Sequence, residues 1–81
     1  MPKALVLINT ETGFMNEVLK ELSKIEEVKE AYSVYGVYDI IAKVEAETMD
    51  GLKDIVAWKI RRISNVRTTL TMIVIEEAHP S

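Results

Sequence analysis

The feature that most constrains the fold is an unbroken apolar run near the start of the chain, Ala4–Ile8. Alternate residues of a strand point to opposite faces, so a strand with one wet face alternates apolar and polar residues. This run does not alternate, because Leu5 and Leu7 point to one face while the three other apolar residues point to the opposite face. The segment Leu70–Ile75 shows the same two-sided character. A sheet containing these strands must be covered on both faces.

Hydrophobic spacing predicts six elements along the chain. Strands are expected over Lys3–Asn9, Val28–Tyr35, Asp39–Glu45 and Val66–Glu76, one helix from an N-cap at Thr12 to Lys24–Glu27, and one from an N-cap at Thr48 to Ser64. This order is that of a ferredoxin-like βαββαβ fold of the α+β class, a four-stranded antiparallel sheet with both helices on one face. We expect one domain over residues 1–77 and a polar tail over residues 78–81.

The open face of this sheet predicts a homodimer. A chain of 81 residues has a small core, and it has no cysteine with which to form disulfides. A second copy of the same sheet is the economical cover for the open face, which gives a barrel-like dimer with Leu5, Leu7 and Met72 in the interface. Trp58 lies away from the apolar stripe of its helix, so it either covers the edge of its own domain or joins dimers into a larger ring.

Composition and charge argue against several function classes. The net charge is −3 and the pI is about 5.1, so the chain does not have the basic character of a nucleic-acid-binding domain. No apolar run is long enough to span a membrane and no signal peptide is visible, so we expect a cytoplasmic protein without membrane contact. With no cysteine and one histidine, His79, we expect no metal site and no cofactor.

The join between the second and third predicted strands is the candidate binding site. It consists of Gly36, Val37, Tyr38 and Asp39. A glycine lets the backbone approach a ligand closely or adopt a positive φ, exposed N–H groups of such a loop hold a carboxylate, and an aspartate pairs with an ammonium group. A plain hairpin turn explains the same residues, and on the residues alone both interpretations stay open.

The segment from Val28 to Val44, VKEAYSVYGVYDIIAKV, resembles the effector-binding module of the Lrp/AsnC family of feast/famine transcription regulators. The hallmark of that family is a strand ending in Gly, one variable residue, and then Tyr or Phe followed by Asp at the start of the next strand. The last strand, VRTTLTMIVIEE, is similar to the final strand of that family. The resemblance runs from Lys3 to Glu77. Regulators of this family carry an N-terminal helix-turn-helix domain, and we expect none here, because the first predicted strand follows Met1 almost at once.

The resemblance implies a stand-alone module that binds a free amino acid or related metabolite between subunits and changes its assembly. It places Gly36–Asp39 of one chain near the last strand of another, with Thr68, Thr69 and Thr71 as candidate contacts. Full-length Lrp/AsnC regulators are candidate partners, and direct nucleic-acid binding is not expected. Two alternatives stay open: a small monooxygenase-like or isomerase-like enzyme on the same dimeric fold, and a purely structural assembly module. No catalytic residue is identified, since no acid–base or nucleophile–base pair is visible.

Overall fold

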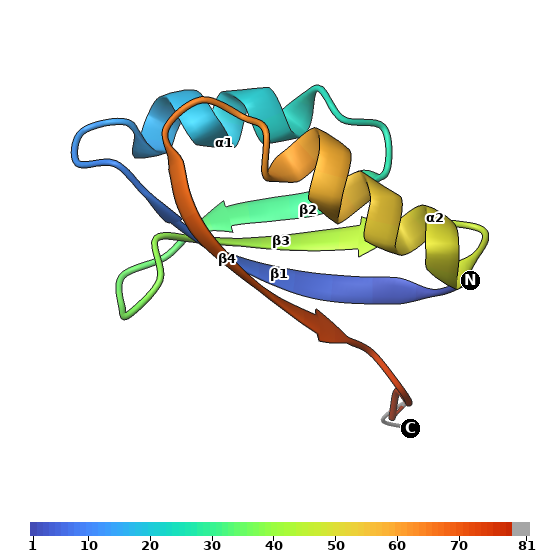
Figure 1. Cartoon of the computed structure of the whole chain (residues 1–81). Helices are drawn as coiled ribbons and strands as arrows, with labels where there is room; N and C mark the ends of the chain where they lie inside the picture. The colour runs from blue at the N-terminus through green and yellow to red at the C-terminus, as the bar shows by residue number, and fades with distance from the viewer. Residues whose placement is uncertain (79–81) are drawn as a thin grey trace.

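The computed structural model describes residues 1–78 and confirms the ferredoxin-like α+β fold (Figure 1). The elements are β1 (Lys3–Thr10), α1 (Met15–Ser23), β2 (Val28–Ser33), β3 (Ile40–Glu45), α2 (Met49–Asp54), the π-helix η1 (Ile55–Ile60) that continues α2, and β4 (Val66–Ile73). Both helices lie on one face of the sheet (Figure 1). Of the predicted tail, only Ala78 lies within the described residues, and His79 lies outside them.

The four strands form one antiparallel sheet in the order β2-β3-β1-β4. Strands β1 and β3 are central and pair with Leu5 opposite Lys43 and Ile8 opposite Ile40. Strand β4 pairs with β1 along most of its length, with an irregularity in the register between Asn9 and Thr10. Strands β2 and β4 are therefore the two edges of the sheet, and each has one unpaired side within the single chain.

The core lies between the sheet and the two helices. Its fully or nearly fully buried side chains are Ala4, Val6, Ile8, Ile40, Ala42 and Val44 from the sheet, and Val18, Leu22, Leu52, Ile55, Val56 and Ile60 from the helices. The buried side chains of both helices face the sheet, and Ile63 packs against this core from the segment that follows η1. Phe14 lies before α1 and is 37% exposed.

The N-terminus of the second helix confirms its predicted cap. The Thr48 hydroxyl accepts a hydrogen bond from the Gly51 backbone N–H at 2.9 Å, which satisfies one of the free donors of the first turn. The prediction of Thr12 as the cap of the first helix is wrong. That helix begins at Met15 after Phe14, which makes no side-chain cap, because Gly13 at φ +86° turns the chain before the helix starts.

Several of the predicted helices and strands extend further along the chain than the observed ones. The first helix ends at Ser23, whose hydroxyl donates to the Lys20 carbonyl at 2.6 Å, and β2 ends at Ser33 rather than Tyr35. Strand β4 ends at Ile73, although Val74 N–H still donates to the Lys3 carbonyl at 3.0 Å. None of the helices within residues 1–78 has the length and apolar character needed to cross a bilayer.

Candidate functional site

The join between β2 and β3 is a hairpin loop at the end of the sheet. The Val34 N–H donates to the Asp39 carbonyl at 2.9 Å, which closes the loop behind Ser33 and Ile40. The loop extends away from the layer of helices (Figure 1). Tyr35 is fully exposed and Val37 is largely exposed, so the tip of the loop presents apolar side chains to solvent.

Asp39 is anchored to the first strand. One carboxylate oxygen, Oδ2, accepts from the Thr10 backbone N–H at 2.9 Å and from the Thr10 hydroxyl at 3.3 Å. The Asp39 backbone N–H also donates to the Ile8 carbonyl at 3.0 Å. Because Thr10 is buried, this carboxylate has a structural role, and within residues 1–78 its second oxygen has no recorded hydrogen-bond partner. That second oxygen is the part of Asp39 available to a ligand cation.

Of the two uses of glycine considered for Gly36, the structure does not show a positive φ. The only glycine with a φ in that range among the described residues is Gly13. A Cβ added to Gly36 would meet no atom within 4 Å. Neither a positive φ nor packing within the single chain therefore requires glycine at this position, and the space beside it is open.

The three candidate threonines of β4 do not share one face. Thr68 lies opposite Asn9, on the open face of the sheet, while Thr69 and Thr71 lie opposite the buried residues Ile8 and Val6 and point to the helix side. All three cannot contact one ligand within a single chain. Thr68 pairs with Asn9, so of the three threonines it lies nearest along β1 to Thr10, the residue that holds Asp39.

A hollow with a volume of about 470 Å³ lies beside this loop. Val37 and Asp39 line it together with residues outside the predicted site: Asn9, Thr10, Glu11, Thr12, Gly13, Met15 and Arg67. The signal for these residues was the polar run that directly follows the buried strand β1. Arg67 lies 3.6 Å from the Glu11 carboxylate, so this hollow presents both a cation and carboxylates.

The open face of the sheet carries the predicted interface residues Leu5, Leu7 and Met72. Register adds Leu70, which lies opposite Leu7 and is 47% exposed, and Ile41 from β3. The polar part of this face lies towards β2, where Lys43 forms an ion pair with Glu30 at 3.3 Å and the Tyr32 hydroxyl donates to the same carboxylate. These two donors lower the pKa of Glu30, with the Tyr32 hydrogen bond as the larger cause.

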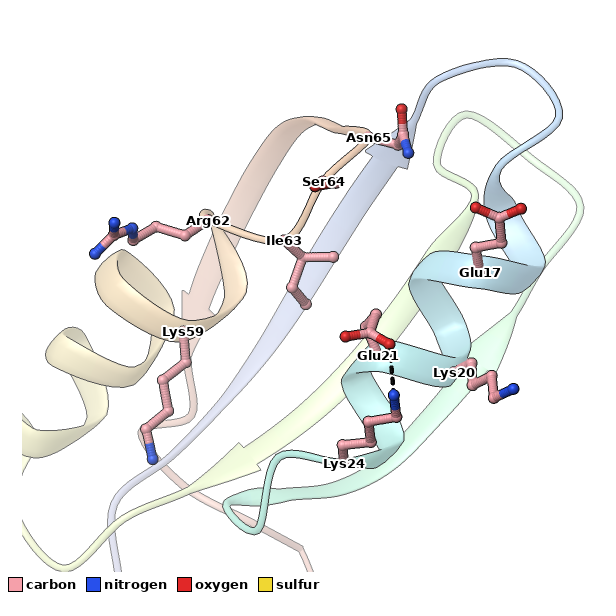
Figure 2. Close-up of a pocket in the computed structure, with 9 residues that line it drawn as sticks. All are labelled: Glu17, Lys20, Glu21, Lys24, Lys59, Arg62, Ile63, Ser64 and Asn65. Atoms are coloured by element: carbon pink, nitrogen blue, oxygen red, sulfur yellow. Dashed lines mark hydrogen bonds and ion pairs between the residues drawn. The ribbon is translucent and has the colours of Figure 1, made fainter.

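A second hollow, of about 560 Å³, lies between α1 and the end of η1 (Figure 2). Its lining carries four cationic side chains and two carboxylates, and none of the predicted ligand residues. Glu21 and Lys24 form an ion pair across one turn of α1 at 2.8 Å. Lys59 forms another at 3.0 Å with Glu27, and that hydrogen bond is the main cause that lowers the pKa of Glu27.

Trp58 lies in the π-helix η1. It is 65% exposed, as its position off the apolar stripe predicts, and the Arg62 guanidinium lies 5.9 Å from the centre of its ring. No group of three or more metal-ligating side chains occurs within the part of the chain that the structure describes.

Comparison with solved structures supports the fold over the whole chain. The protein described as FFRP-DM1 is 44% identical, with a TM-score of 0.89 over 93% of this chain and 100% of its own. The hypothetical protein PHS023 from Pyrococcus horikoshii is also 44% identical, with a TM-score of 0.88 over 98% of this chain and 95% of its own. AsnC of Escherichia coli is 27% identical, with a TM-score of 0.91, and 99% of this chain matches about half of it, 54%.

No curated protein sequence matches this chain. The model of one protein family, described as the Lrp/AsnC ligand binding domain, matches residues 3–81. The resemblance seen in the glycine loop and the last strand is thereby confirmed, and the chain belongs to the Lrp/AsnC ligand-binding domain family.

Proposed function

We propose that this chain is a non-enzymatic module that binds a free amino acid or a related metabolite between copies of itself. The site consists of the Gly36–Asp39 loop of one copy and β4 of another, with Thr68 as the strand contact. Binding favours the assembly in which the two parts meet, which couples ligand concentration to the state of assembly.

The single observation that carries this proposal is the exposure of the Gly36–Asp39 loop and its apolar neighbour Tyr35 in the single chain. Gly36 has room for a Cβ and an ordinary φ, while Tyr35 and Val37 are exposed apolar residues at its tip. A turn that served its own hairpin alone would need neither a glycine of this kind nor an apolar tip. These features are typical of a surface that binds a ligand or another protein chain.

The chemistry of the loop supports an amino acid as the class of ligand. The second carboxylate oxygen of Asp39 suits an ammonium group, and backbone N–H groups near Gly36 suit a carboxylate. A transcriptional regulator from Neisseria meningitidis, NMB0573, has been solved as a complex with L-methionine. It shares the fold alone with this chain, at 15% identity and a TM-score of 0.86.

The first test is thermal unfolding with each of the twenty free amino acids at millimolar concentration. We expect a selective rise in melting temperature for one or a few of them, because ligands that bind only the native assembly stabilise it. Gly36→Ala should abolish that rise while leaving the unliganded melting temperature unchanged. If no amino acid moves the midpoint, the amino-acid proposal is wrong and a purely structural assembly module is the better description.

The open face of the sheet supports a homodimer in which two sheets pack together. Leu5, Leu70 and Met72 form an exposed apolar surface on this face, and exposed surfaces of this kind mark protein contacts. The unpaired edges of β2 and β4 give each copy two further places to pair with its partner. The face is the same on both copies, which suits a two-fold contact.

Two methionines of nearly equal exposure provide a matched test of this dimer. Met72 is 43% exposed on the open face, and Met49 is 41% exposed at the start of α2. We expect Met72→Asp to convert the dimer into monomers in analytical ultracentrifugation, and Met49→Asp to leave the sedimentation coefficient unchanged. Equal behaviour of the two variants would remove the sheet from the interface.

Co-assembly with full-length Lrp/AsnC regulators is the proposed route to transcription. Such a regulator carries the same fold on part of its length, as AsnC of Escherichia coli does over 54% of its chain. A mixed dimer would use the same open face on both chains. The test is co-purification of a tagged copy with a full-length relative, and Met72→Asp should abolish it.

A further inference from the structure

Arg67 is the extra residue of a β-bulge at the start of β4. Asn9 of β1 pairs with Thr68. The next residue of β1, Thr10, pairs with Val66, so Arg67 has no partner on β1. A regular ladder would instead place this arginine opposite Thr10, which is buried.

The bulge separates an apolar side chain from a charged one. Val66 takes the place opposite Thr10 and packs against the core. Arg67 lines the hollow beside the Gly36–Asp39 loop. Bulges are enriched next to active sites, where they change the direction of a side chain. The register of β1 and β4 therefore presents the charge of Arg67 to this hollow rather than to the core.

The hollow has the groups needed for a ligand that carries both charges. Within residues 1–78, its lining has one cation, Arg67, and two carboxylates, Glu11 and Asp39. Asp39 keeps one oxygen for an ammonium group, since its Oδ2 accepts from Thr10. The volume of about 470 Å³ lies in the range of small-molecule sites, which is about 300–1,000 Å³.

The partner of Arg67 within the chain is Glu11. The Nε atom of Arg67 lies 3.6 Å from the Glu11 carboxylate, and the two side chains are 60% and 52% exposed. An ion pair this long and this exposed contributes little to stability. Within residues 1–78 no hydrogen bond involves the terminal nitrogens of the arginine, which are donors suited to a carboxylate. A ligand carboxylate can therefore take the place of Glu11.

We propose that Arg67 binds the carboxylate of a free amino acid, and that Glu11 competes with this carboxylate for the arginine. The inference takes its class of ligand from the proposed function and adds the two residues that set the affinity. One oxygen of the ligand carboxylate accepts from Arg67, and the other accepts from backbone N–H groups of the Gly36–Asp39 loop. The ammonium group binds the second oxygen of Asp39. By occupying the arginine, Glu11 raises the ligand concentration to which the module responds.

The decisive experiment compares free amino acids with their amides by thermal unfolding and isothermal titration calorimetry. The probes are the twenty amino acids and the C-terminal amide of each one that stabilises the original chain or Glu11→Gln. An amide keeps the side chain and the ammonium group and loses the negative charge. We expect the original chain to bind the acid about tenfold more tightly than the amide, because a bond between charged groups is lost.

Two variants separate the roles of the arginine and the glutamate. Arg67→Gln should weaken binding of the acid about tenfold and change binding of the amide by less than about twofold, so that the discrimination disappears. Glu11→Gln should tighten binding of the acid about threefold, because the competing carboxylate is gone. Arg62→Gln makes the same substitution beside the second hollow and should bind both probes as the original chain does. All three side chains are exposed, so the variants should fold, which circular dichroism checks.

The outcomes distinguish this inference from the proposed function. If Arg67→Gln binds an amino acid as tightly as the original chain does, the proposed function stands and the role of Arg67 is wrong. If Glu11→Gln weakens binding, the competition is wrong, because Glu11 is then a ligand contact. If only Glu11→Gln binds amino acids, the competition is supported and the proposed function of the original chain fails. If neither binds any of the twenty, both are wrong.

Discussion

Removal of the Asp39 carboxylate tests whether this residue holds the glycine loop in place. In the chain it accepts hydrogen bonds from the backbone N–H and the hydroxyl of Thr10, which is only 6% exposed. Asp39→Ala leaves a buried backbone donor without its charged acceptor. Hydrogen bonds to charged groups contribute about 1.5–3 kcal/mol, and Asp39 is half-buried, so the expected loss of stability is about 2 kcal/mol.

This loss corresponds to a fall in melting temperature of about 8–16 °C, since 1 kcal/mol shifts a domain of this size by about 4–8 °C. Asp39→Asn keeps an oxygen that can accept from Thr10 but loses the charge, and we expect a loss of about 1 kcal/mol. Within residues 1–78 the exposed Glu26 carboxylate forms no hydrogen bond or ion pair, so Glu26→Ala is the control and should change stability by less than about 0.5 kcal/mol.

The assay is thermal unfolding followed by circular dichroism, at one fixed protein concentration because dimer formation makes the midpoint concentration-dependent. Equal midpoints for Asp39→Ala and Glu26→Ala would refute the reasoning. The result also decides which variant of Asp39 should be used in the ligand-binding experiments. Asp39→Asn keeps the loop in place and removes the charge, so it separates recognition of an ammonium group from loss of the fold.

Three further predictions concern the scaffold. Gly13→Ala should cost about 1 kcal/mol in a urea titration because Gly13 has φ +86°, whereas Gly36→Ala should cost nothing; equal costs would contradict the assigned backbone geometry. Leu22→Ala should lower the free energy of unfolding by about 3 kcal/mol, since Leu22 is fully buried between α1 and the sheet, and a loss under about 1 kcal/mol would place it outside the core. Lys59→Met should lower the melting temperature slightly at pH 7. The Lys59 hydrogen bond lowers the folded-state pKa of Glu27 from 4.5, so its stabilisation is present above that value and is lost as the pH falls through the folded pKa. The gap between the two proteins should therefore close in acid, and a gap that widens there would contradict the ion pair.

The Gly36–Asp39 loop shows which features cannot be predicted from local sequence. The sequence located Gly36 and Asp39 at the turn between two strands, and the family resemblance gave them a role. It did not reveal that Asp39 contacts Thr10, because these residues are 29 positions apart and meet only when β3 pairs with β1. Nor did the sequence decide which glycine has a positive φ, and the structure places it at Gly13 and not at Gly36. A glycine supplies conformational freedom wherever it lies, and only the path of the chain decides which glycine uses it.

The threonines of β4 make the same point for a strand. Sequence alternation separates Thr68 from Thr69 and Thr71, because neighbours in a strand point to opposite faces. Which of the two faces lies under the helices depends on the pairing of β4 with β1, and that register comes from the whole sheet. The face of each threonine, and therefore its access to a ligand, is a tertiary result.

By itself, the sequence determined the order of the elements, the cap at Thr48, the buried face of each helix and the two-sided character of β1 and β4. These features depend on spacings of two, three or four residues, and physical chemistry acts on them within a single strand or turn. The tertiary structure decided the Asp39–Thr10 contact and which face of the sheet each threonine of β4 occupies. These depend on register and packing between distant segments, which no local spacing encodes.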